Sequence, residues 1–211
     1  MERANGAADA AATPRIGVLA MQGDFAEHVQ HLRSVGADAF EVRTRADLDR
    51  CEGLVIPGGE STTIARLLLA FDLMEPLRAR IRDGMPVWGT CAGAIMLAND
   101  VPGLDRPPIG AMDISVERNA FGRQIDSFEA DLEIAGIEGG PLRAVFIRAP
   151  AIQRVGEGVE VMARLDDGTV VACREGDRWA TSFHPELTPD ARLHALFART
   201  VAERRGSEVR A

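Results

Sequence analysis

The N-terminal half of the chain alternates short apolar runs with amphipathic stretches, and few folds accept that alternation. Apolar runs of strand length occupy residues 16–20, 39–42, 54–56 and 86–88. Between them, apolar residues recur at helical spacing in residues 25–32, 64–71 and 75–83. Apolar strands separated by helices are typical of a parallel sheet covered on both faces. The pattern therefore predicts an α/β fold.

Turn and cap signals mark the ends of these predicted elements. Gly36 is placed to end the first helix in a left-handed conformation. Pro57, Gly58 and Gly59 require a sharp turn after the third apolar run. Ser61 is then predicted to cap the next helix.

Beyond Gly103 the chain is richer in strands. Strand-like segments occupy residues 112–116, 128–134, 145–147, 159–165, 169–173 and 179–183. Turn residues at 166–168 and 175–177 separate the last three, so antiparallel pairing is expected in the second half. Thr188 and Pro189 are predicted to begin a terminal helix. Its expected buried face is Leu193, Leu196, Phe197 and Val201.

A chain of 211 residues is of ordinary size for one domain. We expect a disordered tail at residues 1–14, a single domain at residues 15–204 and a frayed tail at residues 205–211. No internal repeat or interdomain linker is apparent in the sequence.

Composition excludes several kinds of function. The net charge of −8 argues against broad contact with a nucleic-acid backbone. All 24 cationic residues are arginine, which excludes a lysine imine and a P-loop lysine within this chain. The longest uncharged stretch, residues 84–98, is broken by Pro86 and Gly89 and is too short to span a bilayer. No membrane contact is expected.

Three scattered cysteines indicate a reducing compartment. Cys51, Cys91 and Cys173 form no C-x-x-C pair and are too few for a disulfide scaffold. The N-terminus lacks the apolar stretch of a secretory signal. We therefore expect a cytoplasmic protein.

Cys91 lies at the centre of a G-x-C-x-G segment between a predicted buried strand and an apolar helix. This pattern is similar to a nucleophile elbow, in which glycines permit a strained turn that exposes the central side chain. A helix N-terminus behind a cysteine favours the reactive thiolate. The alternative is a buried structural cysteine, for which this setting is a poor fit.

His184 and Glu186 supply the base that a cysteine nucleophile needs. They follow a predicted strand directly and are two residues apart, so their side chains fall on the same side of an extended chain. Glu186 can then hold the imidazole while His184 faces the sulfur, which completes a Cys/His/Glu triad. The alternative for a lone histidine is an ordinary core or surface position.

Acyl transfer also requires hydrogen-bond donors for an oxyanion. The backbone N–H of Ala92, directly after the cysteine, is one candidate, and that of Gly59 is the other. Glycine lets a peptide N–H approach a ligand closely. An ordinary turn between strand and helix would also explain the glycines of this loop.

These motifs resemble the class I glutamine amidotransferases. Residues 89–93 and 184–186 match the family triad. Within this family, the chain more narrowly resembles the vitamin B6 branch, which contains the glutaminase subunits of pyridoxal 5'-phosphate synthase. That match rests on residues 19–23 (LAMQG), 57–63 (PGGESTT), 116–129 (VERNAFGRQIDSFE), 146–150 (FIRAP) and 182–188 (SFHPELT). The resemblance covers the chain from Pro14 onward. It implies a three-layer, flavodoxin-like α/β sheet, mostly parallel with antiparallel strands in the second half, and makes residues 15–204 a glutaminase domain.

The resemblance also implies an activity and a substrate site. L-glutamine would be hydrolysed to glutamate and ammonia, with Cys91 as nucleophile, His184 as proton carrier and Glu186 orienting the histidine. Arg118 and Arg148 are the cations expected at the substrate carboxylate, since a guanidinium can bind a carboxylate through two hydrogen bonds. The remaining positions implied in the glutamine site are Gly59, Glu60, Ser61, Ile147 and Gln22, the last helping to organise the oxyanion site.

The resemblance further implies a partner. Ammonia would pass to a synthase subunit, in a hetero-oligomer of twelve plus twelve subunits, and docking would switch the glutaminase on. No cofactor is implied. His28 and His31 have the spacing of a metal pair, but no third ligand is evident and a solvated helix face is expected. Cys51, Cys173 and His194 are expected to be structural or incidental.

Other functions stay open at this point. The chain could be the glutaminase subunit of a different amidotransferase, such as that of the histidine pathway, or a non-catalytic binding module on the same fold. A peptidase or esterase that uses the same elbow is a third option.

Overall fold

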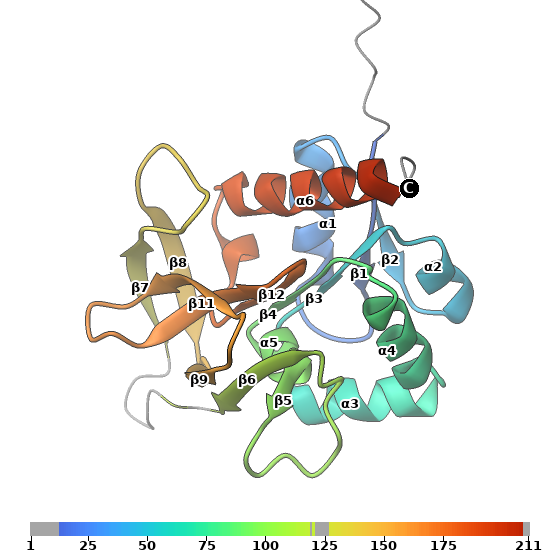
Figure 1. Cartoon of the computed structure of the whole chain (residues 1–211), viewed down its shortest axis with the longest axis horizontal. Coiled ribbons are helices and arrows are strands. Elements are labelled where there is room, and N and C mark those ends of the chain that lie inside the picture. The colour runs from blue at the N-terminus through green and yellow to red at the C-terminus, as the bar shows by residue number, and fades with distance from the viewer. Residues whose placement is uncertain (1–12, 119, 121–126, 209–211) are drawn as a thin grey trace, which may run out of the picture.

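A computed structural model describes residues 13–118, 120 and 127–208. Residues 119 and 121–126 lie outside the described part, as do residues 1–12 of the expected N-terminal tail and residues 209–211. Within the described part, one sheet of ten strands forms the centre of the molecule, with helices on both of its faces (Figure 1). None of the helices described is both long and apolar enough to cross a membrane.

The parallel half of the sheet has the order β2–β1–β3–β4–β12. Its strands are β1 (Arg15–Leu19), β2 (Asp38–Val42), β3 (Gly53–Ile56), β4 (Val87–Thr90) and β12 (Arg178–Thr181). Neighbouring strands are parallel throughout this half. β12 comes from the end of the chain, yet it pairs with β4, and its position next to β4 decides which loops meet at the sheet edge.

The other half of the sheet contains the antiparallel strands. The order continues from β12 through β11 (Val170–Glu175), β9 (Ala151–Val155) and β6 (Met112–Glu117) to β5 (Ala98–Asp100), while β10 (Glu160–Arg164) pairs with β11. β7 (Ser127–Leu132) and β8 (Leu142–Ile147) form a separate two-stranded antiparallel sheet. The predicted mostly parallel sheet with antiparallel strands in its second half is confirmed.

Helices on the two faces cover two separate cores. One face carries α1 (Phe25–Ser34) and α6 (Arg192–Glu208), and the other carries α3 (Ser61–Ala70), α4 (Met74–Arg82) and α5 (Ala92–Leu97) (Figure 1). Alternate strand residues serve the two cores: Leu54 and Ile56 face α3 to α5, whereas Val55 faces α1 and α6. Both strand faces are buried, which explains why these strands are apolar throughout.

Several predicted boundaries were wrong. The terminal helix begins at Arg192 rather than Thr188, because Pro185–Leu187 forms a 3-10 turn, η1. That helix continues to Glu208 and so includes residues 205–208, while the frayed tail expected at residues 205–211 stays a prediction. The cap of α3 is Glu60, whose carboxylate accepts from the N–H groups of Thr62 and Thr63, and not Ser61. Short α2 (Arg45–Asp49) and strands β5 and β9 had no prediction.

Candidate active site

The carboxyl ends of four parallel strands bring the predicted functional segments together. β1, β3, β4 and β12 are consecutive neighbours in the sheet, and each is followed by one of these segments. Gln22 follows β1, Gly59 follows β3, Cys91 follows β4 and His184 follows β12. Since parallel strands end at the same edge, the loops converge there, which is where open α/β sheets bind ligands.

Cys91 occupies a strained turn between β4 and α5. Its φ of 48° and ψ of −105° lie outside the regions that side chains ordinarily adopt. The glycines around it are required by space: a Cβ on Gly93 would overlap the Ile56 carbonyl, and one on Gly89 would overlap the backbone of Gly93. The strand, tight turn and helix predicted for a nucleophile elbow are therefore present.

His184 reaches Cys91 because β12 lies beside β4 in register. Thr181 pairs with Thr90, and the Cys91 N–H donates to the Thr181 carbonyl at 2.8 Å. The two strands thus deliver both residues to one point, where the Cys91 side chain lies close enough to His184 to raise the pKa of the imidazole. The Nδ1 atom of His184 is 2.7 Å from Oε1 of Glu186, so Nε2 is the ring nitrogen left for Cys91.

The electrostatics of the three side chains favour a charged histidine. Burial alone lowers the pKa of His184, but its hydrogen bonds to Cys91 and Glu186 outweigh burial and raise the pKa to about 10. Burial raises the pKa of Glu186, yet the neighbouring His28 and His184 hold it well below its usual range. A carboxylate beside an imidazolium is the arrangement that orients a histidine next to a cysteine nucleophile.

The other two cysteines have the opposite environment. Burial raises the pKa values of the Cys51 and Cys173 thiols to about 12. All three cysteines are buried and free. Cys51 and Cys173 are therefore inert thiols, as the sequence led us to expect.

The glycine loop after β3 packs directly on Cys91 and His184. A Cβ on Gly58 would overlap Cε1 of His184 and lie 3.3 Å from Cβ of Cys91. Gly59 has a φ of +144°, which favours glycine, and packs against the side chain of Gln22. Oε1 of Gln22 accepts from the Glu60 N–H at 2.6 Å, so Gln22 tethers this loop. The Ala92 N–H lies in the first turn of α5, where a helix offers it no acceptor.

A cavity of about 380 Å³ opens at this edge of the sheet. Its lining includes every predicted site residue except Glu186, which lies behind His184: Gln22, Gly59, Glu60, Ser61, Cys91, Ala92, Arg118, Ile147, Arg148 and His184. Arg118 donates to the Thr62 hydroxyl at 3.4 Å, and Arg148 has a strained φ of 43°. The cavity has the size of a small-molecule site, and its lining combines two arginines with a buried cysteine.

Comparison with known proteins decides the family. The chain matches the SNO glutamine amidotransferase family over residues 18–203. It belongs to that family. The resemblance found in the motifs is thereby confirmed.

Individual relatives of this family agree over nearly the whole chain. The protein named Pyridoxal 5'-phosphate synthase subunit PdxT from Parafrankia sp. (strain EAN1pec) is 57% identical over 197 residues, which cover 92% of this chain and 96% of that protein. The protein of the same name from Rhodococcus opacus (strain B4) is 54% identical over 198 residues, covering 89% and 97%. A crystal structure of a glutamine amidotransferase has a TM-score of 0.83 at 48% identity, covering 88% and 98%. The class I glutamine amidotransferase fold is confirmed.

Part of the motif that indicated the vitamin B6 branch lies outside the described residues. Of residues 116–129, positions 119 and 121–126 fall outside. Arg118, from the same motif, is described and lines the cavity.

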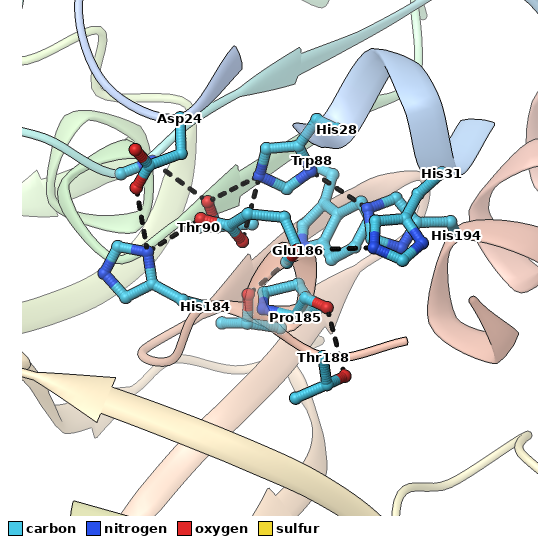
Figure 2. A network of polar contacts seen from close by, with 12 residues as sticks. Asp24, His28, His31, Trp88, Thr90, His184, Pro185, Glu186, Thr188 and His194 are labelled. Carbon is cyan, nitrogen blue, oxygen red and sulfur yellow. Dashed lines mark hydrogen bonds and ion pairs between the residues drawn. The ribbon is translucent and has the colours of Figure 1, made fainter. Parts of the chain in front are cut away.

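The expectation of a solvated helix face for His28 and His31 was wrong. His28 is completely buried and His31 is half-buried, because α1 turns this side toward η1 and α6. His194 is also completely buried, with its ring nitrogen 3.0 Å from that of His28 (Figure 2). The signal was present in the spacing, since His28 is three residues after Phe25 and four before Leu32, both on the apolar face of this helix.

Asp24 was also missed by sequence reasoning. It lines the cavity, and its carboxylate is 4.0 Å from Nδ1 of His184. Asp24, His184 and Glu186 have ligand atoms within 4.8 Å of one another, a spacing compatible with a metal ion. His184 is already hydrogen-bonded to Glu186 and lies next to Cys91, so this arrangement fits acid–base chemistry.

Proposed function

We propose that this chain hydrolyses L-glutamine to glutamate and ammonia and delivers the ammonia for synthesis of pyridoxal 5'-phosphate. One observation carries the proposal: Cys91 on a strained elbow meets a buried His184–Glu186 pair at a cavity lined by two arginines. Family membership supports the reaction, and the names of the relatives support the pathway.

In the proposed mechanism Cys91 attacks the side-chain amide carbon of glutamine as a thiolate. The imidazolium of His184 gives its Nε2 proton to the departing nitrogen, so ammonia leaves and a thioester remains. His184 then takes a proton from water, which attacks the thioester and releases glutamate. Glu186 accepts from Nδ1 of His184 at 2.7 Å throughout and holds the ring in one tautomer.

The N–H groups of Gly59 and Ala92 are proposed to bind the oxyanion of the tetrahedral intermediates. Gln22 supports this role, since it tethers the loop that contains Gly59. Arg118 and Arg148 are proposed to bind the substrate α-carboxylate. Glu60, Ser61 and Ile147 complete the glutamine site by lining the same cavity. The carboxylate of Glu60 is held by Thr62 and Thr63, which leaves its backbone to face the ligand.

The proposed partner is the synthase subunit of pyridoxal 5'-phosphate synthase, in an assembly of twelve plus twelve subunits. Free ammonia at neutral pH is mostly protonated and not nucleophilic, so direct transfer to an acceptor enzyme preserves its reactivity. A synthase that works through lysine imines fits a glutaminase chain without lysine. We propose that docking of this subunit switches the glutaminase on.

We also propose that residues 15–204 make one glutaminase domain, since a single sheet joins both halves of this range. Three free cysteines support a cytoplasmic enzyme.

The proposal is tested by ammonia release from glutamine, with and without the synthase subunit. We expect turnover that rises on docking, loss of turnover in Cys91→Ala, and a covalent adduct of a glutamine analogue on Cys91 by mass spectrometry. An intact biological role for Cys91→Ala with no adduct on the native chain would identify a binding module instead. Equal turnover with and without the synthase would contradict activation by docking.

A further inference from the structure

The carboxylate of Glu186 lies between two imidazole rings, although the triad uses only one. Oε1 is 2.7 Å from Nδ1 of His184, and Oε2 is 3.2 Å from Nε2 of His28 on α1 (Figure 2). The side chains of Glu186 and His28 are both inaccessible to solvent. Oε2 accepts no well-aligned hydrogen bond within the described part of the chain, so His28 is the polar group that compensates its burial.

A second buried histidine determines which ring nitrogen of His28 donates. Nδ1 of His28 is 3.0 Å from Nε2 of His194, whose own Nδ1 has no partner among the described residues. Burial, together with His28 and His31, lowers the pKa of His194, so this ring is neutral. A buried lone pair without a partner costs less than a buried N–H without one, which places the single proton of His194 on Nε2.

The direction of the remaining bonds follows. His194 donates to Nδ1 of His28, so Nε2 is the ring nitrogen of His28 that carries a proton toward the carboxylate. That N–H lies between Oε2 of Glu186 at 3.2 Å and the hydroxyl of Thr90 at 3.3 Å. The groups packed around His28 therefore form a chain in which each ring presents a donor toward the carboxylate.

We propose that His28 is a positioning residue of the glutaminase reaction: it holds the second oxygen of Glu186 so that the first stays directed at His184. The inference rests on the proposed function of the triad. Without the donor of His28, Oε2 is a buried charge with no compensation, and the carboxylate must rotate or take up a proton. Either change weakens its bond to His184, and the imidazolium that supports the Cys91 thiolate loses its partner.

The expected kinetic effect is on kcat and not on KM. His28 does not line the glutamine cavity, so substrate binding keeps its contacts. Misplacement of a catalytic group by about 1 Å can cost about 100-fold in rate. We therefore expect kcat to fall by up to about 100-fold when the donor is lost.

Two polar substitutions distinguish the contribution of Nε2 of His28 from that of Nδ1. In His28→Gln the side-chain amide reaches the position of Nε2 and can still donate to Glu186. In His28→Asn the shorter amide reaches only the position of Nδ1, next to His194. Ammonia release is measured at saturating glutamine, with each variant assembled with the synthase subunit. We expect His28→Gln to keep most of the activity and His28→Asn to lose it, with KM unchanged in both.

Alkylation of Cys91 by iodoacetamide, followed by mass spectrometry, provides a second readout. We expect slower alkylation in His28→Asn, because less Cys91 is thiolate. A variant that merely unfolds would instead expose Cys51 and Cys173, which are protected in the native chain by burial and by pKa values of about 12. Val29→Ala, a buried apolar change one residue further along α1, is the matched stability control and should leave kcat unchanged.

The inference would be overturned if the folded His28→Gln and His28→Asn variants both kept the native kcat and the native rate of Cys91 alkylation. It would also be overturned if both variants lost the same share of activity, because packing of the ring would then be the cause. Failure of the native chain to release ammonia with the synthase would instead refute the proposed function itself, so the two failures are distinct.

Discussion

Gly58→Ala introduces a single methyl group where the loop after β3 packs against Cys91 and His184. The new Cβ would overlap Cε1 of His184 and lie 3.0 Å from its Nδ1 and 3.3 Å from Cβ of Cys91. Gly58 is not among the glycines with positive φ, so alanine is not strained by its own backbone there. Contact with the catalytic residues is therefore the cost that the substitution adds.

The size of the effect follows from the distance the ring must move. Nonbonded carbon atoms are comfortable at about 3.5–4.0 Å, so the imidazole must retreat by roughly 1 Å. A displacement of that size costs about 100-fold in rate, or about 2.7 kcal/mol in the activation free energy. We expect kcat for ammonia release in the synthase complex to fall by this amount.

The control is Gly206→Ala in α6, where a Cβ would meet nothing within 4 Å. It should leave kcat unchanged and stabilise the exposed helix by up to about 1 kcal/mol. Circular dichroism melts establish that both variants are folded. A folded Gly58→Ala enzyme with native kcat would refute the packing of this loop against the catalytic imidazole.

Three further predictions concern substrate binding, stability and pH. Arg118→Gln should raise KM by roughly 10- to 100-fold, since a charge-assisted hydrogen bond contributes about 1.5–3 kcal/mol. The control Arg106→Gln, at an exposed position, should leave KM unchanged. Equal KM values for the two variants in steady-state assays would contradict the carboxylate-binding role of Arg118. Thr90→Val removes the hydroxyl that accepts from the Gly58 N–H at 3.0 Å, and it should lower the free energy of unfolding in urea by about 1–3 kcal/mol. Thr90→Ser keeps the hydroxyl and should lower it less. An unchanged urea midpoint in Thr90→Val would count against this hydrogen bond. Because the pKa of His184 is raised from 6.5 to about 10, its contribution to stability is complete below pH 6.5 and is lost as pH rises toward 10. Urea titrations between these pH values should show a smaller alkaline loss in Cys91→Ala, and identical slopes would argue against the Cys91–His184 bond.

Sequence reasoning predicted what depends on local pattern. The apolar runs of β1, β3 and β4 and the elbow at Cys91 could be found because periodicity and glycine placement are properties of a few adjacent residues. His184 and Glu186 were found for the same reason. The meeting of Cys91 with His184, however, depends on β12 pairing with β4, which no local pattern specifies.

The burial states that sequence reasoning predicted wrongly depend on tertiary contacts. His28 was read as solvated because histidine is often exposed, but α6 and η1 cover this side of α1. Phe71 shows the opposite error: it is the last residue of the predicted apolar helical pattern over residues 64–71, yet it is 61% exposed. It lies one residue beyond the end of α3, where helical periodicity no longer applies.

The pairing of β12 with β4 has a consequence for the order of events during synthesis. Thr181 lies beside Thr90 in the sheet but is made 91 residues later, so the proposed nucleophile leaves the ribosome long before its proposed base does. An incomplete chain that ends before Arg178 contains Cys91 without His184. If His184 is the base, as proposed, the nascent protein is unable to liberate ammonia until β12 has been translated and has joined the sheet.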